Sequence, residues 1–140
     1  MAIKLWGLFG FLAGLLCFMC SCSSSSVRAN SGVKSPGYQT ITAEAAYKMM
    51  KESNDYILLD VRTEHEFKEK HIDGAILMPF YDVKNRAEAE LTDKNAKILI
   101  YCRGGAMSAG AAKTLVDKGY TQVISFGGIQ TWPYETVSGN

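Results

Sequence analysis

The sequence is poor in the residues that build metal sites and disulfides. Only two of its 140 residues are histidine, His65 and His71, and of its four cysteines only Cys102 lies beyond residue 22. Two histidines six residues apart and one cysteine are too few for a zinc-type ligand set. A single cysteine also cannot close a disulfide inside a domain. We therefore expect no metal and no internal disulfide in the folded part.

Net charge is nearly absent as well. Fifteen Lys and Arg residues stand against fourteen Asp and Glu residues, which gives a formal net charge of +1. A protein that binds nucleic acid is expected to show a strongly basic face, so we expect no nucleic-acid partner. There is no internal repeat, and the length suits one domain rather than two.

The one long apolar run lies at the N-terminus. It covers residues 5–19 and follows a single basic residue, Lys4. A transmembrane helix needs about 20 apolar residues, so this run is short for a membrane span. A short apolar run after a basic start is typical of an export signal.

Cysteines end this run in a pattern that resembles a bacterial lipoprotein signal. In that family a small residue precedes the cysteine that becomes the lipidated N-terminus, and Ser21 before Cys22 fits this requirement. Met19 stands where the family usually has leucine. We favour lipidation at Cys22; a plain cleaved signal and an uncleaved anchor stay open. Each alternative places the protein outside the cytoplasm, in the periplasm or at the cell surface. Any membrane contact is expected only through an N-terminal anchor.

Composition divides the chain into three parts. Residues 1–22 are the signal segment, and residues 23–36 are a Ser- and Gly-rich stretch without hydrophobic period, which predicts a flexible tether. Residues 37–140 are the folded domain, which is long enough to bury one core.

Apolar runs alternate with helical patterns in the folded part. Five segments are expected to be strands: residues 38–41, 56–59, 75–77, 97–101 and 122–125. Continuous apolar runs suit strands buried on both faces of a parallel sheet. Thr42 is expected to cap one helix, and Gly119 to follow the end of another. The alternation predicts an α/β fold with a central, mainly parallel five-stranded sheet flanked by helices.

The segment from Cys102 to Ser108 carries the strongest chemical signal. It runs from a buried strand through a glycine pair, Gly104 and Gly105, into a helix N-terminus. Glycines let backbone amides turn inward, and amides in front of a helix dipole form an anion-binding nest. A thiol in such a cradle is expected to act as a thiolate nucleophile, with Arg103 as a cation at the rim. The alternative is an unreactive cysteine at the end of a buried strand.

Motifs along the whole folded part resemble those of rhodanese-like domains. The first signature is Asp60-Val61-Arg62, Glu66-Phe67, His71-Ile72-Asp73-Gly74-Ala75 and Pro79; the active loop is Tyr101-Cys102-Arg103, Gly105 and Ser108; the closing signature is Gly127-Gly128 and Trp132. They occur in the family's order and span about residues 38–137. Lys70 stands where the common pattern has glycine, which is a mild departure.

The resemblance implies a rhodanese-like three-layer fold and a sulfurtransferase. Cys102 would take sulfane sulfur from a small donor such as thiosulfate, polysulfide or a persulfide. It would pass the sulfur to a thiol or cyanide-like acceptor, or to a protein, without a cofactor. The substrate- and anion-binding loop carried over from the family is Arg103, Gly104, Gly105, Ala106, Met107 and Ser108. Asp60 and Arg62 are expected to support this loop structurally.

One departure from the family concerns the charge of the active loop. The loop often has a second basic residue where this chain has Met107. The pocket is therefore expected to be less positive, which favours donors that are bulkier or less charged than thiosulfate.

Two other function classes compete with sulfur transfer. Rhodanese-fold phosphatases and arsenate reductases use a cysteine, five residues and then an arginine that clamps the anion, but here Ser108 takes the place of the arginine. A binding or carrier module without turnover stays open, because rhodanese-like domains also serve as recognition units. His71 is expected to be a helix-end residue rather than a general base, and Trp132 a packing residue.

Overall fold

The computed structural model describes residues 34, 35 and 37–139. The predicted signal segment, the lipidation candidate Cys22 and nearly all of the predicted tether lie outside the described residues. No helix in the described part is long and apolar enough to cross a membrane.

The described residues form six strands, four α-helices and one turn of 3₁₀ helix. In chain order they are β1 (Lys34–Ser35), β2 (Tyr38–Thr40), α1 (Ala43–Glu52), β3 (Ile57–Asp60), α2 (Glu64–Glu69), β4 (Ile76–Leu77), α3 (Phe80–Glu90), β5 (Lys97–Cys102), α4 (Ala106–Asp117), β6 (Gln122–Gly128) and η1 (Ile129–Thr131). All five predicted strands are present, with ends that differ from the prediction by up to three residues.

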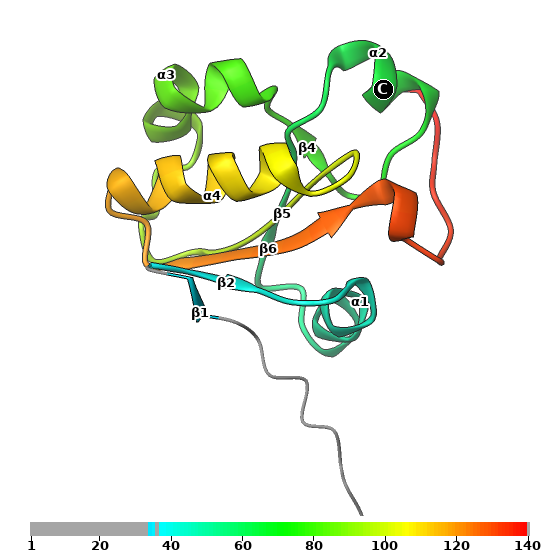
Figure 1. The fold of residues 1–140 in the computed structure, drawn as a ribbon, viewed down its shortest axis with the longest axis horizontal. Helices are drawn as coiled ribbons and strands as arrows, with labels where there is room; N and C mark the ends of the chain where they lie inside the picture. The colour runs from blue at the N-terminus through cyan, green and yellow to red at the C-terminus, as the bar shows by residue number, and fades with distance from the viewer. Residues whose placement is uncertain (1–33, 36, 140) are drawn as a thin grey trace, which may run out of the picture.

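The strands make one sheet in the order β1-β2-β6-β5-β3-β4. Strands β2, β6, β5, β3 and β4 run parallel, which confirms the predicted five-stranded parallel sheet (Figure 1). The short β1 adds an antiparallel edge beside β2 that was not predicted, since two residues carry no hydrophobic alternation. The longest strands, β5 and β6, lie side by side at the centre of the sheet.

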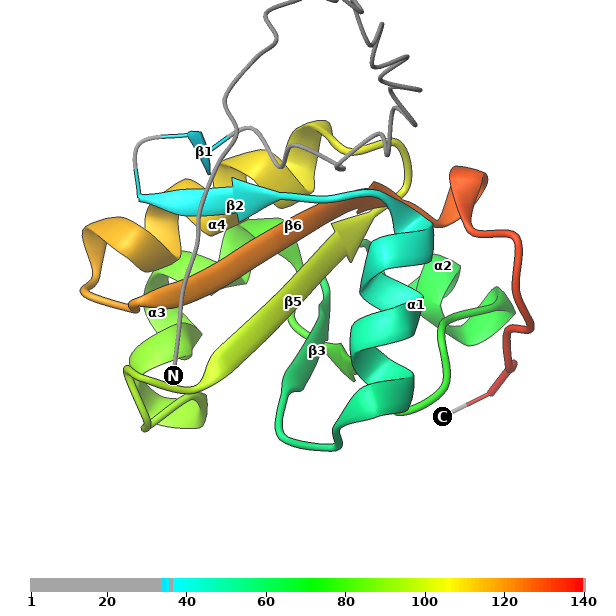
Figure 2. The same ribbon diagram turned by 90° about the horizontal axis from the view of Figure 1, so that it is seen from below.

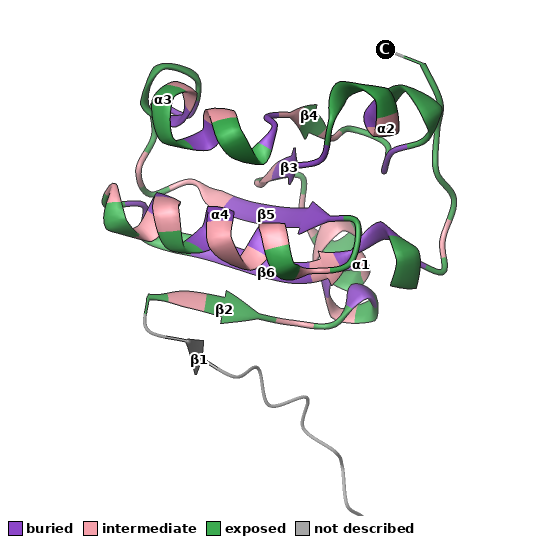
Figure 3. Ribbon diagram, turned by 45° about the horizontal axis from the view of Figure 1, so that its top comes forward, coloured by how far each residue is buried: buried purple, intermediate pink, exposed green. Residues whose placement is uncertain are grey.

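Helices cover both faces of the sheet, so the fold has three layers. Helices α3 and α4 lie on one face and α1 on the other (Figures 1 and 2). Because successive strand residues point to opposite faces, β5 supplies both cores. Ile98, Ile100 and Cys102 pack on the α3–α4 side, whereas Leu99 and Tyr101 pack on the α1 side. Almost all of β5 is buried (Figure 3).

Local signals explain where several helices begin and end. Thr42 caps α1 as predicted, because its side chain accepts a hydrogen bond from the Ala45 amide at 3.2 Å. Gly119 follows α4 with a positive φ of 90°, which also matches the prediction. Helix α2 was not predicted, although Thr63 and Glu66 form a complete capping box at its start.

The C-terminal segment is fastened to the chain just after α2. His71 and Val137 exchange two backbone hydrogen bonds of 2.8 Å each. The His71 ring stacks on Phe67, and its Nδ1 lies 2.8 Å from the Phe67 carbonyl oxygen at the end of α2. These contacts confirm His71 as a helix-end residue.

Three strands end together at the carboxyl edge of the sheet. Their last residues are Asp60 on β3, Cys102 on β5 and Gly128 on β6. A register shift between β5 and β6 pairs Ile100 with Ser125 but Cys102 with Gly128, so β6 carries one extra residue. Such a bulge re-aims the chain that follows. Here it brings the end of β6 against the loop after Cys102.

Candidate active site

Cys102 lies at the bottom of a tight turn between β5 and α4. The residue is 1% exposed. The amide of Gly105 donates a hydrogen bond to Cys102 Sγ at 3.0 Å. Gly105 stands immediately before α4 with a φ of 109°, a conformation that favours glycine because it has no Cβ. The sulfur therefore faces a backbone donor at the positive end of a twelve-residue helix.

Ser108 links the sulfur to the neighbouring strand. Its hydroxyl lies 3.7 Å from Cys102 Sγ, and it can donate to the carbonyl oxygen of Gly105 at 2.9 Å or of Gly127 at 3.0 Å. The hydroxyl of Ser125, on β6, donates to Ser108 Oγ at 3.1 Å. Both serines are buried. Sequence reasoning placed Ser108 in the loop but missed Ser125.

The end of β6 closes the loop from the other side. The amide of Gln130 donates to the carbonyl oxygen of Arg103 at 3.2 Å. At Gly128 a Cβ would collide with that same carbonyl. Glycine at position 128 therefore lets the backbone of β6 approach the backbone of Arg103 closely. Gly127 differs, because it has a positive φ of 87° and open space around it.

Arg103 follows Cys102 in the loop with a largely exposed side chain, but its charge is not free. Its guanidinium forms an ion pair with Glu66 of α2 at 2.7 Å. The other oxygen of Glu66 accepts from the backbone and hydroxyl of Thr63 at 3.3 and 2.9 Å. Partial burial acts to raise the pKa of Glu66, but these bonds outweigh it and hold the pKa below its ordinary value. The sequence pattern alone predicts no role for Glu66 in the site.

A small hollow with charged walls opens beside Arg103, with a volume of about 220 Å³. We name it the charged hollow; it is lined by Arg62, Glu66, Glu69, Lys70, Arg103, Ile129 and Gln130. Three cations face two carboxylates there, and Asp60 beneath Arg62 is the third negative charge. The formal charges around the charged hollow therefore balance.

Asp60 and Arg62 form a buried ion pair behind the site. Arg62 Nη2 lies 2.6 Å from Asp60 Oδ2 and donates to the Lys70 carbonyl at 2.7 Å. The guanidinium lies over the Tyr101 ring at 5.6 Å. Burial, reinforced by the charge of Asp60, raises the pKa of Tyr101. The pair thus contacts the residue before Cys102.

Two predicted loop residues are mainly packing or surface positions. Met107 is half-buried and packs against the core on the α3–α4 side, and Ala106 is exposed at the start of α4. Cys102 is the only cysteine among the described residues, and no three His, Cys, Asp or Glu side chains cluster within them as metal ligands.

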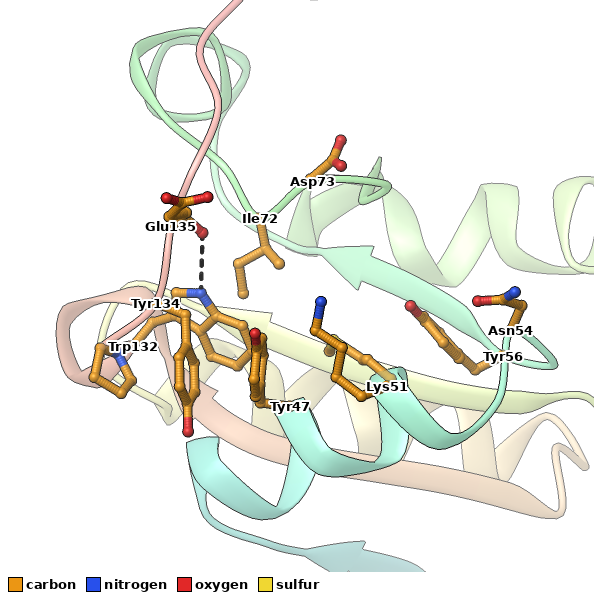
Figure 4. A pocket seen from close by; sticks show the side chains of 11 residues that line it. Tyr47, Lys51, Asn54, Tyr56, Ile72, Asp73, Trp132, Tyr134 and Glu135 are labelled. Carbon is orange, nitrogen blue, oxygen red and sulfur yellow. Dashed lines mark hydrogen bonds between the residues drawn. The ribbon is translucent and has the colours of Figure 1, made fainter.

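A second, larger hollow of about 830 Å³ lies on the α1 face and shares no residue with the Cys102 loop. Figure 4 shows its aromatic wall: Tyr47 and Tyr134 stack with ring centroids 3.7 Å apart, and Trp132 lies edge-on beside them. Trp132 Nε1 donates to the Glu135 carbonyl at 3.4 Å. Trp132 is buried in this cluster, which confirms its packing role.

Comparison with known proteins finds a family match that covers most of the described residues. The family model described as rhodanese-like domain matches residues 42–134. Thiosulfate sulfurtransferase PspE of Escherichia coli is 35% identical over 81 residues, 58% of this chain and 78% of that protein. Thiosulfate sulfurtransferase GlpE of Coxiella burnetii is 32% identical over 96 residues, 68% of this chain and 87% of that protein.

Solved structures agree with the sequence matches. The structure titled rhodanese with anions from E. coli superposes with a TM-score of 0.57 at 33% identity, covering 60% of this chain and 99% of that one. A rhodanese-like domain protein from Staphylococcus aureus gives a TM-score of 0.64 at 27% identity, covering 72% of this chain and 98% of that one.

Proposed function

Because the chain belongs to the rhodanese-like domain family and is homologous to thiosulfate sulfurtransferases, we propose that it is a sulfurtransferase that carries sulfane sulfur on Cys102. The observation that carries this proposal is the 3.0 Å hydrogen bond from the Gly105 amide to Cys102 Sγ at the N-terminus of α4. A backbone donor and a helix dipole stabilise negative charge on sulfur, which both halves of the reaction require.

The reaction consists of two displacements at sulfur. The Cys102 thiolate attacks the outer sulfur of the donor; the donor's S–S bond breaks, and its electron pair leaves on sulfite when the donor is thiosulfate. The enzyme then holds a Cys102 persulfide. An acceptor thiolate or cyanide attacks the outer sulfur, the persulfide bond breaks, and its electron pair returns to Cys102 Sγ. Electrons balance within the two steps, so no cofactor is needed.

The loop residues have different roles in this scheme. The backbone of Arg103, Gly104, Gly105 and Ala106 forms the cradle around the persulfide, and Ser108 fixes its shape through Gly105 and Gly127. Met107 contributes packing rather than charge.

Asp60 and Arg62 support the site from behind. They hold Tyr101 and, through it, the end of β5 that carries Cys102. Their removal is expected to act on stability and on the position of the thiol together.

A non-turnover carrier or binding module is the second candidate, because Cys102 is buried, with only 1% of the residue exposed. In that case sulfur enters or leaves only when a protein partner opens the loop. Phosphatase chemistry has no support here, because Ser108 bonds inward to the loop where those enzymes hold a phosphate-clamping arginine.

Sulfur loading tests the proposed function. The full-length protein in detergent is incubated with thiosulfate, polysulfide or a low-molecular-weight persulfide, and the peptide carrying Cys102 is weighed. A gain of one sulfur atom that is absent in Cys102→Ser supports the sulfurtransferase. No gain with any donor, although an alkylating probe labels Cys102, would favour the carrier module.

We also propose that the protein is exported and tethered by a lipid on Cys22. The support is the sequence of the first 22 residues. Metabolic labelling with a palmitate analogue in a bacterial host tests it, with Cys20→Ser as the matched control for Cys22→Ser. Loss of label in Cys22→Ser alone supports lipidation there, whereas an exported protein that never takes up label contradicts it.

A further inference from the structure

The one charged side chain of the Cys102 loop makes a contact that the active-loop sequence does not reveal. Arg103 is the only charged residue between Cys102 and Ser108. Its side chain is 62% exposed, yet the guanidinium bonds the Glu66 carboxylate at 2.7 Å through Nε and Nη2. The cation that a dianionic donor would use is therefore already engaged by a carboxylate.

Glu66 is held in place independently of Arg103. It is the third residue of α2, only 13% exposed, and its second oxygen closes the capping box with Thr63. Because α2 fixes this carboxylate, it stays near Arg103 when that side chain moves. A negative charge is thus built into the wall of the charged hollow.

The other charged side chains around the charged hollow add no net positive charge. Arg62 is paired with Asp60, and the remaining charged residues of the wall are Lys70 and Glu69, which oppose one another in sign. Because these formal side-chain charges balance, they add no net attraction for a dianion to that of the backbone amides at the start of α4.

We propose that Glu66, by engaging Arg103, sets the net charge at the entrance to Cys102 and thereby selects sulfur donors of low negative charge over dianions such as thiosulfate. This inference rests on the proposed sulfurtransferase function and names the substrate class of that same site. Glu66 touches neither sulfur nor donor; it is a specificity-determining residue that acts through Arg103.

Two pairs of reagents separate charge from other effects. Thiosulfate is a dianion and methanethiosulfonate a monoanion, and both give up a sulfane sulfur, leaving sulfite and methanesulfinate. Iodoacetate and iodoacetamide alkylate a thiol by the same displacement of iodide but differ by one charge. The second pair needs no sulfur transfer, so it tests the entrance even if the proposed function fails.

The experiment compares the full-length protein with Glu66→Gln, Arg103→Gln and the double variant, using sulfur loading and alkylation resolved at Cys102. Glu66→Gln should raise the rate roughly sixfold with thiosulfate and about two- to threefold with methanethiosulfonate or iodoacetate at low salt. Iodoacetamide should be unaffected. Arg103→Gln should lower the rates with anions by similar factors.

The double variant distinguishes charge from structure. Removing both members of the ion pair restores the original net charge, so the preference between the two reagents of each pair should return to that of the unmodified protein. Glu64→Gln removes the same charge from α2, but Glu64 pairs with Lys68 and does not line the charged hollow; it should leave the preferences unchanged.

Two results would overturn the inference: equal changes for both reagents of a pair in Glu66→Gln, or a double variant that fails to restore the preference. Failure of the sulfurtransferase itself is seen separately, as absence of Cys102 loading from either donor in the unmodified protein. Circular dichroism and thermal unfolding of each variant verify that the fold is kept.

Discussion

The hydroxyl of Ser125 on β6 donates to that of Ser108 on α4 at 3.1 Å, and Ser108 Oγ lies 3.7 Å from Cys102 Sγ. Three side chains from β5, α4 and β6 are thus connected at the centre of the site. Ser108 also has the carbonyl oxygens of Gly105 and Gly127 as acceptors, whereas the buried Ser125 hydroxyl bonds to Ser108.

The contact between Ser108 and Ser125 predicts that the effects of their alanine variants on the free energy of unfolding are not additive. Ser108→Ala should reduce the free energy of unfolding by about 1–3 kcal/mol, because it strands the buried Ser125 hydroxyl. Adding Ser125→Ala removes that stranded group, so the double variant should cost less than the sum of the single variants. Urea unfolding of all three variants tests this. A fully additive double variant would show that the two hydroxyls do not interact.

The buried pair of Asp60 and Arg62 is expected to contribute strongly to the stability of the fold. Asp60→Asn leaves the Arg62 charge buried without its carboxylate, which should cost about 3–5 kcal/mol. Lys113→Gln is the matched control, because Lys113 and Asp117 are largely exposed and such pairs contribute about 0.2–1 kcal/mol. Both values follow from urea unfolding. Similar costs for the two variants would contradict the supporting role of Asp60.

The two glycines at the end of β6 should respond differently to alanine. Gly128 has an extended backbone, but a Cβ there collides with the Arg103 carbonyl. Gly128→Ala should therefore displace the Cys102 loop and slow both sulfur loading and alkylation. Gly127→Ala meets open space at a positive φ, so it should cost about 1–2 kcal/mol of stability with a smaller effect on Cys102. The reverse order would exclude steric closure by Gly128.

The contribution of Glu66 to the free energy of unfolding should depend on pH. Its pKa in the folded protein lies below the ordinary value of 4.5, because hydrogen bonds from Thr63 and the charge of Arg103 outweigh the effect of burial. A lowered pKa stabilises the fold above pH 4.5, and this contribution is lost as the pH falls through the lower, folded-state value. The unmodified protein should therefore exceed Glu66→Gln in unfolding free energy near neutral pH. The difference should shrink below pH 4.5; a difference that grows in acid would contradict the sign.

Continuous apolar segments made the centre of the fold predictable. Ile98, Leu99 and Ile100 are all fully buried because α3 and α4 cover one face of β5 and α1 covers the other. Helix α2 escaped prediction because Phe67 is its only buried residue, which leaves no hydrophobic period. Its one local signal was the capping box of Thr63 and Glu66. Helix α3 begins with the exposed pair Phe80 and Tyr81, which obscures its amphipathic pattern.

In the site, too, the residues in local sequence patterns were predictable, whereas the contacts between residues distant in sequence were not. Cys102 and Gly105 were identified because a strand, a glycine pair and a helix follow one another along the chain. Glu66 reaches Arg103 across 37 residues, and Ser125 reaches Ser108 across 17. These pairs meet only because the fold places β6 and α2 beside the end of β5. No local sequence pattern predicts that placement. The predictions for residues 1–33 stay predictions.

The strand order also determines when the sheet can be completed. Strand β2 comes near the start of the folded part, but its partner in the parallel sheet is β6, near the end. Strands β3, β4 and β5 are neighbours in the sheet and follow one another along the chain, so they can associate while β2 still has no parallel neighbour. Pairing of β2 with β6 closes a much longer stretch of chain, which is slow compared with local contacts. We therefore expect the β2 edge of the sheet to form only after β6 has joined β5.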